Sequence, residues 1–284
     1  MTVSEKAYAK INLFLDVTGR RDDGYHNIDT VMQSVSLCDD ITITAVSSDK
    51  IEINISSNDK TLELGESNLI YKSALKYVLY FGIRARMDVK LTKRIPIGAG
   101  LGGGSSDAAA TLRAMNRIYG LATKEQLYEM AAEIGSDVPF CIDGGCAFCS
   151  GKGEKIRPYK VKLYRNIVIA IGESRVSTPR AYALLDEKYG DFRSYNEEKS
   201  FSDNGCPTLY YNIFESVIDS REISNIKEVM KESGAKFTLM SGSGPSVYGV
   251  FCNGFSASLA KTRLNKQGFF AVKCRPVSGT KENI

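Results

Sequence analysis

Five glycines lie between residues 98 and 104, in the stretch PIGAGLGGGSSDAAA that begins at Pro96. A turn needs one or two glycines, so five indicate that something approaches the backbone closely. The stretch then becomes helix-forming at Ser105, Ser106 and Asp107, which are residue types favoured at helix N-caps. Backbone N–H groups that lead into a helix N-terminus form an anion site. The loop therefore predicts a phosphate-binding site.

The surrounding sequence does not fit the familiar nucleotide loops. Gly98, Gly100 and Gly103 formally match the dinucleotide pattern G-x-G-x-x-G. That pattern requires a strand after the helix with an acidic residue at its end, whereas here a second helix follows, with Glu125 at its start. A Walker loop ends in Gly-Lys-Ser/Thr, and no lysine lies between residues 96 and 112. A protein-kinase loop joins two strands, whereas this one opens a helix.

A lysine and an asparagine interrupt an apolar strand near the N-terminus, in AYAKINLFL. Burial of Lys10 costs desolvation free energy unless the side chain is paired or lies at a cleft. Asn12 falls on the same face of the strand, because side chains alternate along it. The pair predicts a polar position in a cleft wall, with an edge-strand lysine as the simpler alternative. Asp137, in GSDVPF, could likewise be only a turn or N-cap residue.

The sequence has seven cysteines, and Cys141, Cys146 and Cys149 follow the C-x4-C-x2-C spacing of plant-type iron–sulfur sites. Apolar residues interleave with them, and the segment predicts strand, turn and strand. In a strand, Cys146 and Cys149 point to opposite faces. We interpret the three as structural thiols, assign no metal-ligating residue in the protein, and read the odd cysteine count as typical of a reducing compartment.

Composition limits the class of protein. The chain has 284 residues, with 43% hydrophobic and 25% charged, which fits one large or two modest globular domains. A net charge of +4 is too weak to indicate nucleic-acid binding, and mildly favours a small anionic substrate. No stretch reaches about 18 apolar residues, and the N-terminus lacks signal- and transit-peptide patterns. A cytoplasmic protein is expected.

Hydrophobic periodicity predicts an α+β protein, with helices on one face of its strands. The first 56 residues read as strands, with a hairpin between 40–46 and 50–56. Ser67 is the expected N-cap of the first helix and Gly82 its C′ residue. Further elements of the first half are a strand over 85–95 and helices over 106–119 and 123–135.

The second half begins with a strand over 166–171 and a helix over 178–190. A polar loop is expected over 191–204, followed by helices at 210–219 and 221–233. Strands over 236–240, 246–251 and 269–276, and a helix over 256–268, complete the chain. We place two domains at 1–155 and 156–284, with the option that the last strand returns to the first domain.

Three motifs together resemble the GHMP kinases. The first is KAYAKINLFLDVTGRRDDGYHNIDTVMQSVSLCD from Lys6, the second is the glycine stretch from Pro96, and the third is LMSGSGPSVYGVF from Leu239. The AKINLFL and GYHNI segments, with GSDVPF at 135–140, are most similar to the branch that acts on 4-diphosphocytidyl-2-C-methyl-D-erythritol. The resemblance spans residues 6 to about 275.

The resemblance implies a two-domain fold. The N-terminal domain would be like domain 2 of ribosomal protein S5, and the C-terminal domain would be ferredoxin-like. It implies transfer of a phosphoryl group from ATP, with Mg²⁺, to the 2-hydroxyl of the cytidyl substrate, in non-mevalonate isoprenoid precursor synthesis. The expected partners are ATP and that cytidine diphosphate compound, with no nucleic acid and no membrane. The protein would be a monomer or a homodimer.

The resemblance also assigns roles to residues. Asp137 would be the catalytic acid–base residue, with Lys10 beside it and Asn12 in hydrogen-bond reach of the substrate. Tyr25 and His26, the one histidine of the chain, would recognise cytosine, and Tyr182 would stack on its other face. The ATP phosphates would bind Pro96, Ile97, Gly98, Ala99, Gly100, Leu101, Gly102, Gly103, Gly104, Ser105 and Ser106, with the two serines near Mg²⁺, and the adenosine would bind near Lys93, Asn68 and Leu69.

Two alternatives stay open at this point. The chain could be a GHMP kinase for mevalonate- or homoserine-type substrates, although an acid or amino acid has no base for Tyr182 to stack on. It could also be a nucleotide-binding regulator without activity, although Lys10 and Asp137 are both present. The second glycine loop, from Gly242 to Gly244, carries too little side chain for chemistry. We expect it to pack against the first loop.

Overall fold

A seven-stranded sheet is built mainly from the first half of the chain, in a computed structural model that describes residues 1–161, 163–173, 176–190 and 210–279. Its order is β3-β4-β2-β1-β8, with β5 beside β2 and β6 beside β5. The strands are β1 (Thr2–Arg20), β2 (His26–Ser47), β3 (Glu52–Ser57), β4 (Ala85–Thr92), β5 (Cys146–Ser150), β6 (Lys155–Pro158) and β8 (Tyr211–Asn212).

The predicted hairpin between residues 40–46 and 50–56 is wrong. Strand β4 lies between β2 and β3, antiparallel to β2 and parallel to β3. The chain passes from β3 to β4 through helix α1 (Leu69–Tyr80), because parallel neighbours need a crossover connection. Alternating hydrophobicity identified both strands correctly, but it does not specify which strand is the neighbour.

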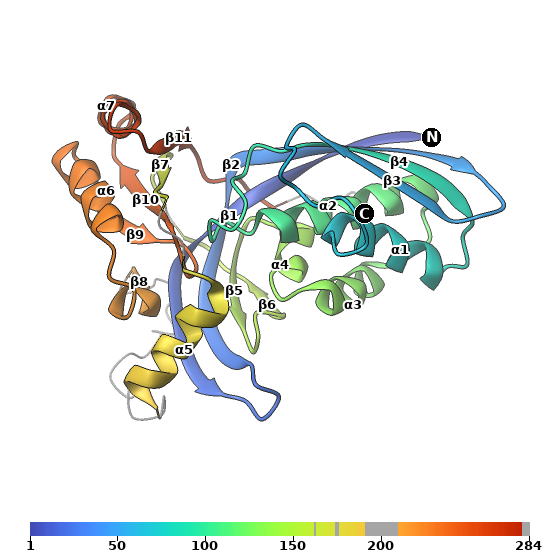
Figure 1. The fold of residues 1–284 in the computed structure, drawn as a ribbon, viewed down its shortest axis with the longest axis horizontal. Helices are drawn as coiled ribbons and strands as arrows, with labels where there is room; N and C mark the ends of the chain where they lie inside the picture. Colours follow the sequence, from blue (N-terminus) through green and yellow to red (C-terminus); the bar gives the residue numbers. More distant parts are fainter. Residues whose placement is uncertain (162, 174–175, 191–209, 280–284) are drawn as a thin grey trace.

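Four helices cover one face of this sheet (Figure 1). Helix α1 begins after Asn68 and not after the predicted Ser67, because the Asn68 side chain accepts the hydrogen bond from the Ile70 N–H. Its predicted end is confirmed, since Gly82 has a φ of 65°. The other helices are α2 (Gly103–Tyr119), α3 (Lys124–Ile134) and α4 (Val138–Asp143).

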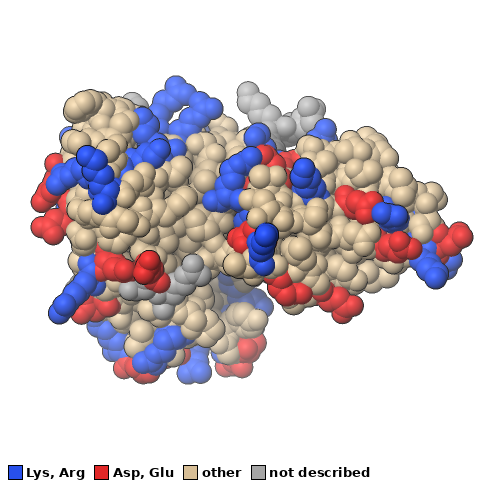
Figure 2. All heavy atoms as spheres, turned by 45° about the horizontal axis from the view of Figure 1, so that its top comes forward, with Lys and Arg blue, Asp and Glu red and all other residues tan. Residues whose placement is uncertain are grey.

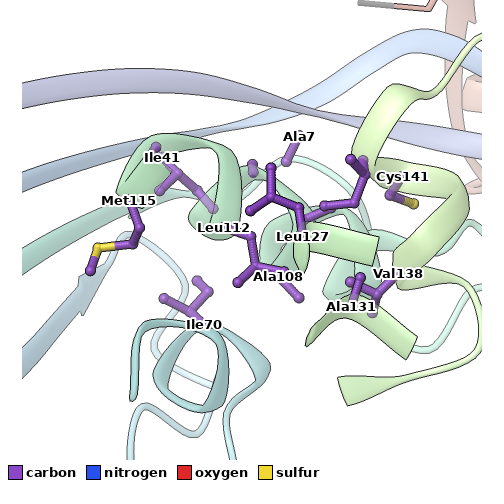
Figure 3. Close-up of a cluster of buried hydrophobic side chains, with 14 of the residues drawn as sticks. Ala7, Ile41, Ile70, Ala108, Leu112, Met115, Leu127, Ala131, Val138 and Cys141 are labelled. Carbon is purple, nitrogen blue, oxygen red and sulfur yellow. The ribbon is translucent and has the colours of Figure 1, made fainter. Parts of the chain in front are cut away.

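The core of this half lies between the helices and the sheet. Figure 3 shows Leu112 of α2 between Ile70 of α1, Leu127 of α3 and Ile41 of β2. All four side chains are fully buried. Burial of this kind stabilises the fold by about 25 cal/mol per Å² of apolar surface.

One helix start and one type of element differ from the prediction. Helix α2 begins at Gly103, with Gly102 as N-cap at a φ of 67° and no side-chain cap. The segment from Val138 is a helix and not a strand, which agrees with Pro139 in its first turn.

The three cysteines of this region lie in two elements. Cys141 lies in α4, and Cys146 and Cys149 lie in β5 with different burial, as expected for opposite faces of a strand. No group of His, Cys, Asp and Glu among the described residues is arranged to hold a metal. The described cysteines are all free thiols.

The second sheet has the order β11-β7-β10-β9, antiparallel throughout. With a helical connection after its first strand and a helix between its last two, this is the β-α-β-β-α-β ferredoxin-like arrangement that the resemblance implied. Its elements are β7 (Asn166–Ile171), α5 (Thr178–Tyr189), α6 (Arg221–Glu232), β9 (Phe237–Met240), β10 (Ser246–Phe251), α7 (Gly254–Lys266) and β11 (Phe270–Cys274).

The helix predicted at 210–219 is wrong. The chain there forms the short strand β8 and the 3-10 helix η2 (Ile213–Ser216). Strand β8 pairs with β1 in the first sheet, so a tertiary contact replaces the helix. The polar loop predicted at 191–204 lies outside the described residues.

The two sheets share several contacts. The Tyr248 hydroxyl of β10 donates to the Asn12 carbonyl of β1 at 2.9 Å. After β11, Pro276 forms a bridge with Val35 of β2, so the chain returns to the first sheet just beyond its last strand. Because β6 belongs to the first sheet and β7 to the second, we propose that the two domains divide between residues 158 and 166.

None of the helices described is long and apolar enough to cross a membrane. On the face in Figure 2, acidic and basic side chains are interspersed. That distribution agrees with the small net charge of +4.

We expect Leu112→Ala to lower the free energy of unfolding by about 2–5 kcal/mol, because it leaves a cavity in the buried helix–sheet core. The matched control is Leu259→Ala on α7, where the leucine is 42% exposed. That substitution should change stability by about 0.5 kcal/mol or less. Urea denaturation followed by circular dichroism measures both, and equal effects would contradict the assignment of the core.

Candidate active site

The glycine loop before α2 folds against its own chain. Gly98, Gly100 and Gly102 have φ values of 67°, 75° and 67°, a region in which side chains are strained. A Cβ on Gly100 would lie 2.2 Å from the Ser241 carbonyl oxygen, and one on Gly102 would lie 2.9 Å from Lys10 Cγ. These glycines are therefore required for close packing inside the protein, not only for approach of a ligand.

The second glycine loop packs against the first, as expected. The Ser241 hydroxyl donates to the Gly100 carbonyl at 3.0 Å, and the Ser246 N–H donates to the Ala99 carbonyl at 3.3 Å. The Gly242 N–H donates to Asn12 Oδ1 at 3.0 Å. Both loops are thus fixed to β1.

Lys10 and Asp137 come together at this junction. The Lys10 Nζ lies 3.5 Å from Asp137 Oδ2, with the lysine side chain 6% exposed and the aspartate 28% exposed. Asp137 stands at the N-cap position of α4, yet its side chain makes no cap hydrogen bond. The capping role that could have explained this aspartate is therefore absent.

Asn12 organises the lysine. Its Oδ1 accepts a hydrogen bond from Lys10 Nζ at 2.8 Å, and its Nδ2 donates to Thr30 Oγ1 at 2.8 Å. The Thr30 hydroxyl in turn donates to the Phe14 carbonyl at 2.6 Å. This chain of hydrogen bonds holds the Lys10 ammonium group in place within β1 and β2.

A cavity of about 620 Å³ opens in front of Lys10 and Asp137. Its size suits a nucleotide-sized ligand. Both glycine loops, the tip of the β1–β2 hairpin and α5 contribute to its wall. The predicted residues that line it are Lys10, Asn12, Tyr25, His26, Gly100, Gly102, Ser105, Asp137 and Tyr182.

Aromatic rings form another part of this wall. The Tyr182 ring stacks on His26 with centroids 4.6 Å apart and an interplanar angle of 21°, and its edge meets Phe214 at 5.0 Å. Burial raises the pKa of Tyr182, so its hydroxyl stays protonated. Tyr25 is 57% exposed, and the ammonium group of Lys152 lies 4.7 Å from its ring centroid. In this structure the ring that stacks on Tyr182 is therefore that of His26, the residue next to Tyr25.

The two serines after the loop differ. Ser105 lines the large cavity. Ser106 is 2% exposed, and its hydroxyl donates to the Tyr8 carbonyl of β1. Ser105 is therefore the hydroxyl that faces the cavity.

A second cavity of about 240 Å³ lies on the other side of the loop–helix junction. It is lined by Asn68, Leu69, Lys93, Ile97 and Gly104, which include all three residues predicted for adenosine. A Cβ on Gly104 would meet only Leu69, at 3.5 Å. A Cβ on Gly103 would instead lie 2.9 Å from Ile95 Cγ2. Gly104 therefore has more room for a ligand beside it than Gly103.

Sequence reasoning missed the buried ion cluster behind this cavity. The Lys93 Nζ lies 2.6 Å from both Asp39 Oδ2 and Asp107 Oδ2. Burial raises the pKa of Asp107 to about 8, an effect that the positive charge of Lys93 opposes. The residue type of Asp107 favours an N-cap position, whereas the residue lies inside α2.

Two further wall residues were missed, Lys152 and Asp186. Asp186 follows Tyr182 by four residues on α5, so helical spacing could have placed both on one face. No pattern in the sequence marks Lys152, which follows a glycine in a turn.

Comparisons with known proteins agree with this arrangement. The model of the GHMP kinases N terminal domain matches residues 68–145, and that of the GHMP kinases C terminal matches residues 214–269. A crystal structure of homoserine kinase from Cytophaga hutchinsonii has a TM-score of 0.70, 18% identity and coverage of 99% of this chain and 96% of that one, which shows the fold alone. Both parts of the chain have the GHMP kinase fold.

Two closer relatives specify the branch. The 4-diphosphocytidyl-2-C-methyl-D-erythritol kinase of Caldicellulosiruptor saccharolyticus is 40% identical over 272 residues, and the match covers 91% of each chain. A crystal structure of 4-(cytidine 5'-diphospho)-2C-methyl-D-erythritol kinase has a TM-score of 0.78 and 31% identity, and covers 96% of this chain and 99% of that one. The chain belongs to the 4-diphosphocytidyl-2-C-methyl-D-erythritol kinase family.

We expect Gly104→Val to weaken ATP binding by about tenfold or more, because its branched side chain enters the smaller cavity. Gly104→Ala is the matched control, since its Cβ fits at 3.5 Å from Leu69. Calorimetric titration with ATP and with cytidine 5'-diphosphate measures both sites. Unchanged ATP affinity in the valine variant would remove this cavity from the nucleotide site.

Proposed function

We propose that the protein is an ATP-dependent kinase that phosphorylates the 2-hydroxyl of 4-diphosphocytidyl-2-C-methyl-D-erythritol, in non-mevalonate isoprenoid precursor synthesis. The observation that carries the proposal is 40% identity over 91% of the chain to a relative of that name. The cavity of about 620 Å³ supports it, because one wall combines a Lys–Asp pair with aromatic rings. ATP and a water-soluble diphosphate substrate agree with the cytoplasmic location expected from the sequence.

Asp137 acts on the substrate hydroxyl in this proposal. Phosphoryl transfer depends mainly on positioning and charge stabilisation, with a carboxylate to orient or deprotonate the attacking hydroxyl. The Asp137 carboxylate suits this role because it lines the cavity and is not used as a helix cap. Lys10, 3.5 Å away, holds the carboxylate in place and adds positive charge where the phosphoryl group transfers.

The ATP site is proposed at the junction of the two cavities. The loop from Pro96 to Ser106 would hold the phosphates, helped by the positive N-terminal end of α2. Asn68, Leu69 and Lys93 would contact the adenosine, which is supported by their place in the smaller cavity.

Mg²⁺ would come with the nucleotide. Mg²⁺ commonly keeps several waters and binds through substrate phosphates and one or two protein oxygens. The donors at the site fit that mode, since the Ser105 hydroxyl lines the cavity beside the N-terminal end of α2. We assign the Ser105 hydroxyl as its protein contact. The ion would neutralise the charge that develops on the phosphates.

The cytidyl group is proposed to bind the aromatic part of the wall. Tyr25 offers an exposed ring, and the stacked His26 and Tyr182 offer a second aromatic surface. Lys152, which lies over Tyr25 and lines the cavity, adds a positive charge suited to the diphosphate. Asn12 would contribute hydrogen bonds to the substrate beside Lys10.

The two alternatives are less well supported. The homoserine kinase structure is only 18% identical, against 31% for the cytidyl enzyme. A regulator without activity would not need Lys10 and Asp137 to stay paired at the cavity. An ATP-turnover assay with cytidyl, mevalonate and homoserine acceptors separates the three functions.

We expect Asp137→Asn to lower kcat by about 10²–10⁴-fold while leaving ATP binding unchanged, because the amide cannot take the hydroxyl proton. The matched control is Asp143→Asn at the far end of α4, where the carboxylate pairs with Lys124 at 2.8 Å. Steady-state kinetics and ATP titration on the purified variants test this. Near-normal kcat in the Asp137 variant would exclude it from the mechanism.

We expect Tyr182→Ala to raise KM for the cytidyl substrate by about 5- to 150-fold, since stacking contributes about 1–3 kcal/mol per base. Tyr182→Phe keeps the ring and should stay near the wild-type KM. KM for ATP should not change in either variant. An alanine variant with normal cytidyl affinity would place Tyr182 outside the base site.

A further inference from the structure

Asp186 of α5 joins the C-terminal half of the chain to the hairpin of the N-terminal half. Its Oδ1 lies 2.7 Å from His26 Nε2, and its Oδ2 lies 3.9 Å from an Arg20 guanidinium nitrogen. Arg20 ends β1 and His26 begins β2, so both belong to the tip of one hairpin. In Figure 1 the blue hairpin lies beside the yellow helix α5. Asp186 therefore links two chain segments that both line the cavity.

Helix α5 holds the imidazole at two points. Asp186 and Tyr182 are four residues apart, and thus lie on one face of the helix. The carboxylate bonds to the ring nitrogen, and the tyrosine ring stacks against the imidazole face at 4.6 Å. A carboxylate partner of this kind fixes both the tautomer and the orientation of an imidazole.

The contact differs from an ordinary surface ion pair. The His26 side chain is only 7% exposed, and Asp186 lines the same cavity as His26 and Tyr182. On the same helix, Arg180 and Glu187 form a pair at 2.7 Å with side chains 55% and 60% exposed, and neither lines the cavity. Exposed pairs of that second kind contribute little. The pair of His26 and Asp186, in contrast, forms part of the cavity wall.

We propose that Asp186 is a positioning residue for the cytidyl substrate. Its carboxylate accepts the Nε2–H of His26 and holds the imidazole against Tyr182, so that the hairpin tip and α5 present a preformed aromatic wall. Such preorganisation improves binding because less ordering is required when the ligand arrives. This inference rests on the proposed function, since it concerns the substrate named there. It predicts an effect on substrate binding, with little effect on the transfer step at Asp137.

The single histidine of the chain allows a direct test of the pairing. Protein labelled with ¹⁵N-histidine gives one imidazole spin system, from His26. In the wild type we expect the Nε2-protonated form, with ring protons shifted by the Tyr182 ring. Asp186→Ala should change the nitrogen shifts and reduce the Tyr182 ring-current effect, whereas Glu187→Ala should leave both unchanged. Identical spectra for the wild type and Asp186→Ala would overturn the proposal.

Kinetics then test the consequence. Asp186→Ala should raise KM for the cytidyl substrate by about tenfold, with kcat and KM for ATP within about twofold of the wild type. Asp186→Asn retains an oxygen acceptor and should stay within about threefold. An unchanged cytidyl KM, or an equal rise in KM for ATP, would overturn the proposal. If the wild type does not use the cytidyl substrate, the proposed function is wrong, and the histidine spectra still decide whether Asp186 orients His26.

Discussion

Close approach of the glycine loop to strand β1 is the constraint on which the site depends. The Lys10 N–H donates to the Leu101 carbonyl at 2.9 Å, so the loop adds to the strand where a bulge interrupts the pairing of β1 with β2. A Cβ on Gly102 would overlap the Lys10 side chain, and one on Gly100 would overlap the second loop. Only glycine meets both requirements, since these positions also have positive φ. Because Gly100 and Gly102 have no side chain, the backbones of the first glycine loop, the second glycine loop and β1 can meet at one point.

The same contacts join the two halves of the chain and prepare the site. Asn12 accepts from the Gly242 N–H and from Lys10, while its carbonyl accepts from the Tyr248 hydroxyl. A change in the packing of the second sheet would therefore reach the Lys10 ammonium group through a single residue. The arrangement is rigid because the polar groups involved are buried and hydrogen-bonded, and their separation would leave them unpaired.

Buried charges fix the elements around the cavity. Arg113 of α2 pairs with Glu5 at 3.1 Å and donates to the Cys141 carbonyl at 2.7 Å. It thereby ties α4, which begins just after Asp137, to the N-terminal strand. Breaking a buried pair leaves an uncompensated charge, so these contacts resist displacement. The Lys93 cluster does the same for the first turn of α2, beside the smaller cavity.

The sequence by itself determined the local features. The glycine loop, the polar positions at Lys10 and Asn12, most strands and helices, and the motifs in order were all readable, because turn chemistry and hydrophobic periodicity act over a few residues. Tertiary structure alone decided that β4 separates β2 from β3, that residues 211–216 form β8 and η2, and that Asp39 and Asp107 share Lys93. It also decided that Asp186 meets His26, 160 residues away in the chain. Periodicity states which side of an element is buried, but the partner on that side is set by the packing of segments far apart in sequence.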